Sequence, residues 1–422
     1  MLRDYQVSQR PLEVNFRTLV GAIPIHDLTH SICPYPARLL RQIPRFFLHC
    51  EQLSTRDTVV VDPFCGSGTV LVEAVAAGKQ AWGIDKNPFA RLLSQVKTTH
   101  VDCQAANAAA LAVLERAKRS RTVVEPEIVN AELWFAPKVR SALRRIKGAI
   151  SDSKLPIEIE RYLLVCLAVT ADKCSLRDRR IPVPVRRSDW QQFSVKQDSR
   201  TVWMSFEAVA HAVAARISGL PKSTGAAFVY GDDALNVDEF YDASMSGIIQ
   251  RPSLLVTSPP YGAAQKYIRS SSLAIGWTGL ASPKGLTQLE RELIGREHLR
   301  KPDLEMLQSP SPLIDHEIRC IFKRDPQRAA IYAEYFRAMD KAIAAFGRLL
   351  QPGAFSVVIA GTNIVAGRMI ETHRFLRDLS VNHGFSPVLE LRDTIRGRTL
   401  LTKRASTARP LSHETIHVLQ RR

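Results

Sequence analysis

The stretch TVVVDPFCGSGTVLVEAVAAG at residues 58–78 decides the fold. A run of β-branched residues ends at Asp62, a loop with two glycines follows, and helical periodicity begins at Thr69. Gly66 and Gly68 allow a tight turn, and the N-terminus of the next helix presents free N–H groups. The stretch therefore predicts a strand–loop–helix unit that holds a carboxylate or a phosphate. No Lys-Ser or Lys-Thr pair follows the loop, which argues against a nucleoside-triphosphate site.

Similar apolar runs, each closed by an acid, a Gly or a Pro, recur along the chain and predict further strands. The predicted strands are 58–64, 80–85, 226–233, 253–260 and 354–361, and helical periodicity appears at 69–78, 88–97 and 328–350. This alternation predicts an α/β fold, a doubly wound and mostly parallel sheet covered by helices on both faces. Ligands bind beyond the carboxyl ends of the strands in such sheets.

Two stretches interrupt the alternation. Residues 103–220 carry candidate helices and are far longer than a βα connection requires, so they predict a mainly helical insertion with possible DNA contact. Residues 276–326 are polar and predict a second insertion that could recognise the target. We expect an N-terminal segment and cofactor-binding half at 1–102, and a catalytic half at 221–275 and 327–422.

Composition restricts the class of protein. Lys and Arg outnumber Asp and Glu by 58 to 41, giving a net charge of +17, which suits a polyanionic partner. The seven cysteines are scattered without zinc-ligand spacing, so we expect free thiols and no metal. The N-terminal residues lack a signal-peptide pattern, and no apolar run is long enough to cross a membrane. We therefore expect a cytoplasmic protein.

The second motif is TSPPY at residues 257–261, after the apolar run SLLV. An exocyclic amine on a base is a poor nucleophile because its lone pair is delocalised into the ring. The Ser258 hydroxyl and the Pro259 carbonyl could accept the two N–H groups and turn the lone pair toward a methyl donor. Pro260 stiffens the loop, and Tyr261 offers a flat face for a base flipped out of its stack. The motif predicts methylation of a base amine.

Together the two motifs resemble those of the S-adenosylmethionine-dependent DNA amino-methyltransferase family, whose Asp-Pro-Phe-x-Gly-Ser-Gly-Thr loop binds the methionine end of the cofactor. The resemblance implies a class I, Rossmann-like fold. It also implies that an acid after the second strand binds the ribose, and that an acid after the third contacts the adenine. THSICPYPAR at residues 29–38 resembles the segment that precedes the cofactor loop in this family. The cofactor-binding residues so implied are Tyr35, Asp62, Phe64, Cys65, Gly66, Ser67, Gly68, Thr69, Asp85, Lys86 and Asp232.

The resemblance also bears on the target base. Ser at the first position of the catalytic tetrapeptide goes mostly with cytosine N4 and Asp mostly with adenine N6, so Ser258 favours N4 of cytosine in DNA. Cytosine C5 is disfavoured because no thiol lies at this strand end. Methylation of adenine N6, or of an RNA base amine, remains open, as does a catalytically silent subunit that only binds nucleic acid. DNA and a cognate restriction nuclease are the expected partners.

DNA-contacting candidates lie in the first insertion. Residues 173–200 hold eight Lys or Arg against three Asp, with Trp190 and Phe193 interleaved, a mixture suited to phosphates and exposed bases. A solvated loop is the alternative. The arginines expected to bind DNA are Arg179, Arg180, Arg186 and Arg187. A second basic group comprises Arg392, Arg396, Arg398, Lys403 and Arg404, and four histidines without partner pattern are taken as structural or surface residues: His26, His30, His211 and His373.

Overall fold

A computed structural model describes residues 1–23, 28–221, 225–262, 267–296, 307–394 and 413–422. Its main sheet has eight strands in the order β1-β9-β10-β6-β5-β2-β3-β4. The strands are β1 (Leu12–Val14), β2 (Val59–Asp62), β3 (Gln80–Gly83), β4 (Ala226–Val229), β5 (Leu254–Thr257), β6 (Phe355–Ala360), β9 (Phe385–Thr394) and β10 (His413–Arg421), while β7 (Asn363–Val365) and β8 (Arg368–Ile370) form a separate hairpin.

The sheet is mostly parallel, as predicted. β2 pairs in parallel with β3 and with β5, β3 with β4, and β5 with β6; only β10 runs antiparallel, between β6 and β9. The five strands expected from the apolar runs are all present. The sheet extends further, through β10, β9 and β1, on the side where no strand was expected. The fold is that of a class I, Rossmann-like methyltransferase domain.

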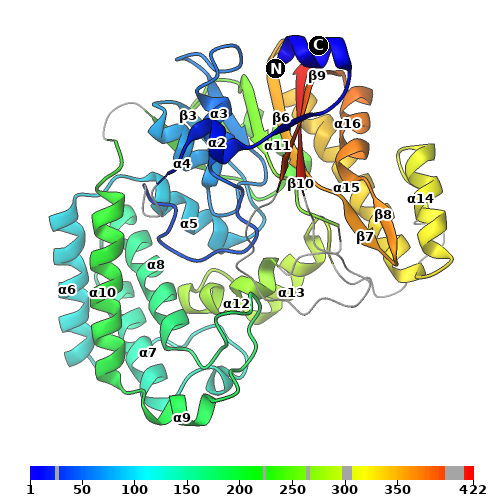
Figure 1. The fold of residues 1–422 in the computed structure, drawn as a ribbon. Helices are drawn as coiled ribbons and strands as arrows, with labels where there is room; N and C mark the ends of the chain where they lie inside the picture. Colours follow the sequence, from blue (N-terminus) through cyan, green and yellow to red (C-terminus); the bar gives the residue numbers. More distant parts are fainter. Residues whose placement is uncertain (24–27, 222–224, 263–266, 297–306, 395–412) are drawn as a thin grey trace.

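Helices cover both faces of the sheet and build a separate lobe (Figure 1). The helices are α1 (Leu2–Ser8), α2 (Phe16–Val20), α3 (Gln42–Leu48), α4 (Thr69–Ala76), α5 (Pro88–Thr98), α6 (Cys103–Arg119), α7 (Pro137–Ser151), α8 (Ile157–Cys174), α9 (Trp190–Val195), α10 (Ser199–Ile217), α11 (Val237–Phe240), α12 (Tyr267–Thr278), α13 (Pro283–Glu292), α14 (Pro312–Phe322), α15 (Pro326–Leu349) and α16 (Thr372–Asn382). No helix in the described part of the chain is long and apolar enough to cross a membrane.

The lobe is formed by the first insertion. α6, α7, α8 and α10 pack on one another, and α12 and α5 join their hydrophobic core, which buries Tyr162, Phe206 and Trp277 completely. A helix carrying apolar side chains on a wide stripe must bury that stripe, and these helices do so mainly against each other. The lobe therefore has its own core, continuous with the helix α5 that follows β3.

The central strands bring the two motifs to one edge of the sheet. β2 lies between β5 and β3, with Val61 opposite Leu255 on one side and Trp82 on the other. The parallel strands end at the same edge, so the residues that follow β2, β3 and β5 meet there. α15 and α16 cover the opposite side of the sheet from α4 and α5, with a second large core beneath them (Figure 1).

Candidate active site

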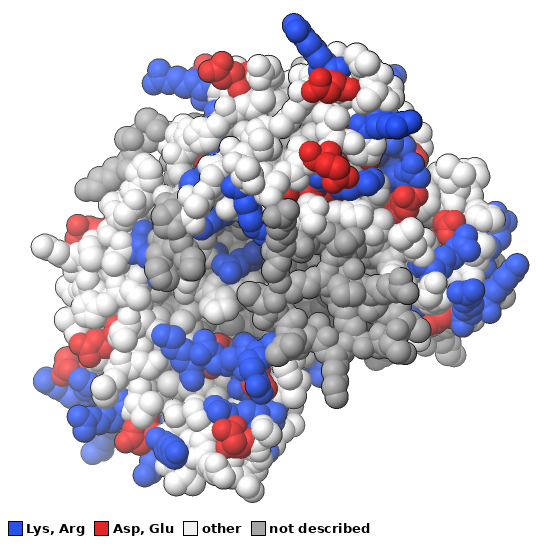
Figure 2. Space-filling view, in the orientation of Figure 1, with Lys and Arg blue, Asp and Glu red and all other residues white. Residues whose placement is uncertain are grey.

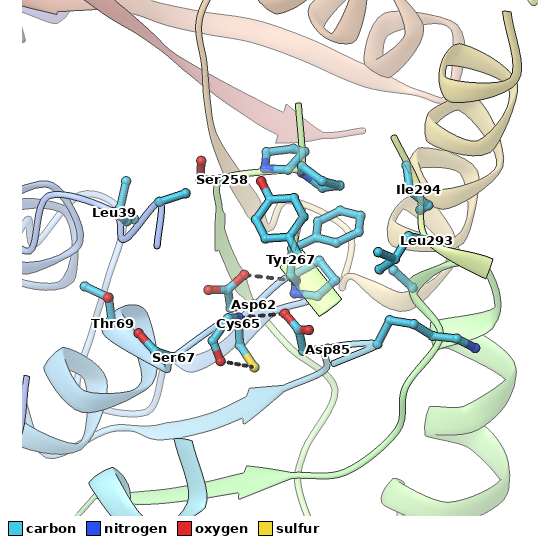
Figure 3. A pocket seen from close by; sticks show the side chains of 18 of the residues that line it. Leu39, Asp62, Cys65, Ser67, Thr69, Asp85, Ser258, Tyr267, Leu293 and Ile294 are labelled. Atoms are coloured by element: carbon cyan, nitrogen blue, oxygen red, sulfur yellow. Dashed lines mark hydrogen bonds between the residues drawn. The ribbon is translucent and has the colours of Figure 1, made fainter. Parts of the chain in front are cut away.

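A cavity of about 1030 Å³, counting the solvent at its mouth, opens at this edge of the sheet (Figure 3). The four residues of the catalytic motif and all the expected cofactor residues except Gly68 line it. The other lining residues are Pro36, Ala37, Arg38, Leu39, Pro63, Val70, Asp233, Ala234, Tyr267, Glu292, Leu293 and Ile294.

Helix α5 holds the glycine loop in place through two hydrogen bonds. The Ser94 hydroxyl donates to the Gly66 carbonyl at 2.9 Å, and the Lys97 ammonium group donates to the Ser67 carbonyl at 3.0 Å. Gly68 has φ +78°, and a Cβ atom there would lie 2.8 Å from the Ser94 hydroxyl. Gly68 thus turns toward α5 instead of the cavity, and its role is to bring the loop close to that helix.

Asp85 stabilises the same loop from the end of β3. Its carboxylate accepts hydrogen bonds from the backbone N–H groups of Gly66 and Asn87, both at 2.8 Å. Burial raises the pKa of Asp85 although these two hydrogen bonds oppose the shift. A carboxylate has about four acceptor positions, so two remain for a ligand in the cavity. The position suits an acceptor for two neighbouring hydroxyl groups.

Two further acids lie beyond Asp85. Asp233 uses one carboxylate oxygen to accept from the Leu235 N–H at 2.9 Å, whereas the Asp232 side chain is half exposed and lines the cavity. Lys86 connects this region to α13: its ammonium group lies 2.6 Å from the Glu292 carboxylate and 3.8 Å from that of Asp232. Glu292 belongs to the insertion at 276–326, so a segment expected to recognise the target lies at the cavity wall.

Asp62 links the two motifs directly. The Thr257 hydroxyl donates to the Asp62 carboxylate at 2.6 Å, and the Phe64 N–H donates to the same oxygen at 3.1 Å. Burial raises the pKa of Asp62 to about 7, against the effect of these two donors. Thr257 belongs to the TSPPY motif, but the sequence alone does not show that β5 pairs with β2. The hydrogen bond between Thr257 and Asp62 was therefore not predicted.

Tyr261 follows two prolines and lines the cavity. Burial raises the pKa of its hydroxyl, and the nearby Glu414 carboxylate on β10 acts in the same direction. Tyr35 enters from the N-terminal segment, where its hydroxyl accepts from the Asn87 side-chain amide at 3.1 Å. In the view of Figure 3, Ser258 and Tyr267 lie above Asp62 and Asp85, and Thr69 and Leu39 lie at the left end.

The four expected DNA-binding arginines lie outside the cavity, in the loop between α8 and α9. Arg179 pairs with Asp172 at 2.9 Å, Arg180 with Asp178 at 2.6 Å and Arg187 with Asp189 at 2.6 Å. The guanidinium groups of Arg186 and Arg187 stack on Trp190 and Phe193, at 3.5 and 3.9 Å from the ring centres. Two of the four arginines are thus stacked on the aromatic side chains of the same segment. Figure 2 shows basic side chains gathered over the helical lobe and again over α14.

The histidines also have partners that the sequence did not indicate. His30 contacts the buried Glu73 carboxylate at 2.7 Å. His373 and His417 are buried and lie 3.2 Å apart, and His417 is 3.7 Å from Glu390. These three residues could hold a metal ion, and none of them lines the cavity. Arg392 lies 3.5 Å from Glu13. His26 and the basic residues Arg396, Arg398, Lys403 and Arg404 lie outside the described residues.

Comparison with known proteins gives sequence matches along most of the chain. Residues 29–95 match the family described as DNA methylase. The chain is 23% identical over 406 residues to the type II methyltransferase M.MvaI of Kocuria varians, across 85% of this chain and 83% of that relative. It is 34% identical over 102 residues to the type II methyltransferase M.MjaII of Methanocaldococcus jannaschii, across 24% of this chain and 19% of that relative.

Among solved structures, the chain resembles an S-adenosylmethionine-dependent methyltransferase from Methanosarcina mazei, with 11% identity and a TM-score of 0.32 over 88% of this chain and 95% of the other. It also resembles the rRNA methyltransferase aviRa from Streptomyces viridochromogenes, with 11% identity and a TM-score of 0.33 over 96% of each chain.

The fold, the glycine loop and the strand-end acids define an S-adenosylmethionine-dependent methyltransferase. The cavity suits this cofactor, since it places a glycine loop at a helix N-terminus beside a partly buried acid with free acceptor positions. In its matched parts the chain is similar to DNA methylases, at residues 29–95, and to type II methyltransferases.

Proposed function

We propose that the protein is a DNA methyltransferase that methylates N4 of cytosine. The observation that carries the proposal is Ser258 at the first position of the catalytic tetrapeptide, lining the cavity beside the cofactor loop. Members of the family with Ser at this position act mostly on cytosine. Ser258 and the Pro259 carbonyl accept the N–H groups of the target amine, and Tyr261 stacks on the flipped base.

The cofactor supplies an electrophilic methyl group on a sulfonium, and the residues of the chain supply alignment. Asp85 binds the ribose hydroxyls, Asp232 and Lys86 lie at the adenosine end, and the glycine loop holds the methionine end together with Tyr35. The two hydrogen bonds at Ser258 and Pro259 orient the amine lone pair. Alignment of this kind acts mainly in the transition state, so these groups determine turnover more than cofactor affinity.

Mass spectrometry of digested DNA tests the proposal. The purified protein is incubated with unmethylated DNA and cofactor, and the nucleosides are separated. N4-methylcytosine is the expected product. N6-methyladenine would retain the mechanism and overturn the choice of base. A parallel reaction contains RNA in place of DNA. If neither DNA nor RNA is methylated, the alternative of a catalytically silent subunit replaces the proposal.

A cognate restriction nuclease is a second proposal, supported by similarity to a protein named as a type II methyltransferase over 85% of this chain. Expression of the chain in a methylation-free host should protect the host DNA from a nuclease that cuts the same site. Sequencing of modified bases in that host identifies the site. A modified site that no nuclease recognises would instead indicate a methyltransferase that works alone.

A further inference from the structure

The segment at the end of α13, residues 292–295, lies at the wall of the cofactor cavity. Glu292, Leu293 and Ile294 line the cavity although they belong to the second insertion. Figure 3 shows Leu293 and Ile294 at the end of the cavity away from Thr69 and Leu39. Two apolar side chains at this end provide a surface for a flat aromatic ring.

An ion pair holds this segment against the residues that follow β3. Lys86 lies 2.6 Å from the Glu292 carboxylate. Gln288, one turn earlier on α13, donates to the same carboxylate at 2.8 Å. The hydrogen bond from Lys86, followed by that from Gln288, lowers the pKa of Glu292, so the group is ionised at neutral pH. The end of α13 is therefore tied to the residue next to Asp85.

The same segment packs closely against the backbone of Tyr261 in the catalytic loop. Gly295 has φ +80°, and a Cβ atom there would lie 2.6 Å from the Tyr261 carbonyl oxygen. A side chain has no space at this position, and the backbone conformation itself favours glycine. Within four residues, the segment thus contacts the cofactor cavity and the backbone of Tyr261.

We propose that residues 292–295 form the outer wall of the adenosine part of the cofactor site and position the Tyr261 loop. The proposal rests on the proposed function, because it takes Asp85 and Lys86 to mark the adenosine end. Leu293 and Ile294 cover the adenine ring, the Lys86–Glu292 ion pair holds the wall in place, and Gly295 supports Tyr261. Cofactor binding and the placement of the target base are coupled through this segment.

Calorimetric binding of two probes tests the wall. S-adenosylhomocysteine carries both ends of the cofactor, whereas 5′-methylthioadenosine lacks the amino-acid end. The double variant Leu293→Ala, Ile294→Ala should weaken binding of both probes by the same factor, roughly tenfold, because lost apolar contacts in a pocket have effects of this size. Unchanged affinity for both probes, or a loss confined to S-adenosylhomocysteine, overturns the proposal.

A double-mutant cycle tests the ion pair. Glu292→Gln and Lys86→Met should each weaken the binding of S-adenosylhomocysteine about two- to fivefold, as expected for a partly exposed ion pair. The double variant should lose little more affinity than the more strongly affected single variant. Glu290→Gln is the matched control, since Glu290 is exposed on the same helix and does not line the cavity. Additive losses would show that the pair does not hold the wall.

Gly295→Ala tests the coupling to catalysis. Displacement of Tyr261 should lower kcat roughly tenfold or more, since small misplacements of aligned groups are costly. Gly353→Ala is the control: its φ is +79°, but nothing lies within 4 Å of the added Cβ atom, so it introduces the same backbone strain without the collision. Equal kcat values for the two variants overturn the coupling.

The variant Asp85→Ala separates the two possible failures. The proposed function requires this substitution to weaken the binding of S-adenosylhomocysteine. If it does not, the cofactor site itself is wrong. If Asp85→Ala weakens binding while Leu293→Ala, Ile294→Ala does not, the cofactor site stands and only the wall is rejected.

Discussion

Asp62 is buried at the junction of the two motifs and responds to pH. Its pKa is raised to about 7 from an ordinary value of 3.8, mainly by burial. Between these two values the folded protein retains a proton that the unfolded chain has released, so this group's stabilising contribution is lost as the pH rises toward 7. A cationic cofactor in the cavity favours the ionised carboxylate instead.

Cofactor binding should therefore release a proton from Asp62. We predict that the affinity for S-adenosylmethionine falls as the pH decreases from 8 to 6, by up to about tenfold per pH unit below the pKa of the free protein. Asp62→Asn should bind more weakly and lose most of this pH dependence. Calorimetry in buffers of different ionisation enthalpy measures the proton release directly. An equally steep pH profile in Asp62→Asn would assign the effect to another group.

Ser258 contributes at the same scale through one hydroxyl. Ser258→Ala removes an acceptor for the target amine, so kcat should fall about 10²- to 10³-fold, the range seen when one aligned hydrogen bond in a transition state is lost. The dissociation constant of the cofactor should stay within about twofold, because binding does not depend on this hydrogen bond. Single-turnover rates and equilibrium binding measure the two quantities separately. A weaker cofactor affinity with unchanged turnover contradicts the assignment.

The helix α5 acts as an element that supports the glycine loop. Lys97 is buried at its end and donates to the Ser67 carbonyl at 3.0 Å. Burial lowers the pKa of Lys97 to about 7 from 10.5, so the unfolded chain binds more protons between these values and the folded state becomes more stable as the pH rises through this range. The loop thus depends on a lysine whose charge is costly to bury.

We predict opposite effects of Lys97→Met on stability and on cofactor binding. The free energy of unfolding at pH 7 should stay equal or rise, because a buried ionisable amine is replaced by an apolar chain of similar length. Cofactor affinity should fall about three- to tenfold, since the hydrogen bond to the loop is lost. Thermal unfolding at pH 7 and pH 9, with calorimetric binding, checks both. Compared with wild type, the variant should gain less stability between pH 7 and pH 9.

Elements with a continuous apolar pattern were predictable from the sequence. The runs that became β2, β3, β4, β5 and β6 were recognisable because each is short, apolar and closed by a turn residue. β10 was not, since its sequence HETIHVLQR contains no continuous apolar run and two of its polar groups, Glu414 and His417, pair only in the folded state. The wall formed by Leu293 and Ile294 was equally invisible, because no local pattern indicates which distant cavity an insertion will reach.

The contact between His373 on α16 and His417 on β10 makes the stability of the protein depend on pH at a second place. Burial lowers the pKa of His373 to about 4 and that of His417 to about 3, from 6.5 in both cases. The unfolded chain takes up these protons first, so stability is lost as the pH falls below 6.5. The double variant His373→Gln, His417→Gln should lose less stability between pH 6.5 and 4 than wild type, by on the order of 5 kcal/mol. Urea unfolding across this range measures the difference, and identical slopes reject the explanation.

At the scale of the whole molecule, the excess positive charge is distributed unevenly. The net charge of +17 suits a phosphate backbone, and the described surface gathers basic side chains over the helical lobe and α14 (Figure 2). Three of the four candidate arginines in the lobe are already paired with aspartates. Exposed pairs of this kind contribute at most about 1 kcal/mol each, so phosphates can replace the aspartates when DNA binds.

Replacing Arg179, Arg180, Arg186 and Arg187 with Ala should therefore weaken DNA binding and flatten its salt dependence. Each lost phosphate contact reduces the slope of log Kd against log salt by about 0.9, so the four together should reduce it by up to about 3.6. Lys118→Ala, Arg119→Ala is the control, because both residues pair with Glu115 in α6 and offer the same kind of exposed ion pair elsewhere in the lobe. Fluorescence anisotropy with a labelled duplex at several salt concentrations gives the slopes. If the quadruple variant and the control have the wild-type slope, the arginines only form a solvated surface, and the insertion at 276–326 becomes the better candidate for the DNA contact.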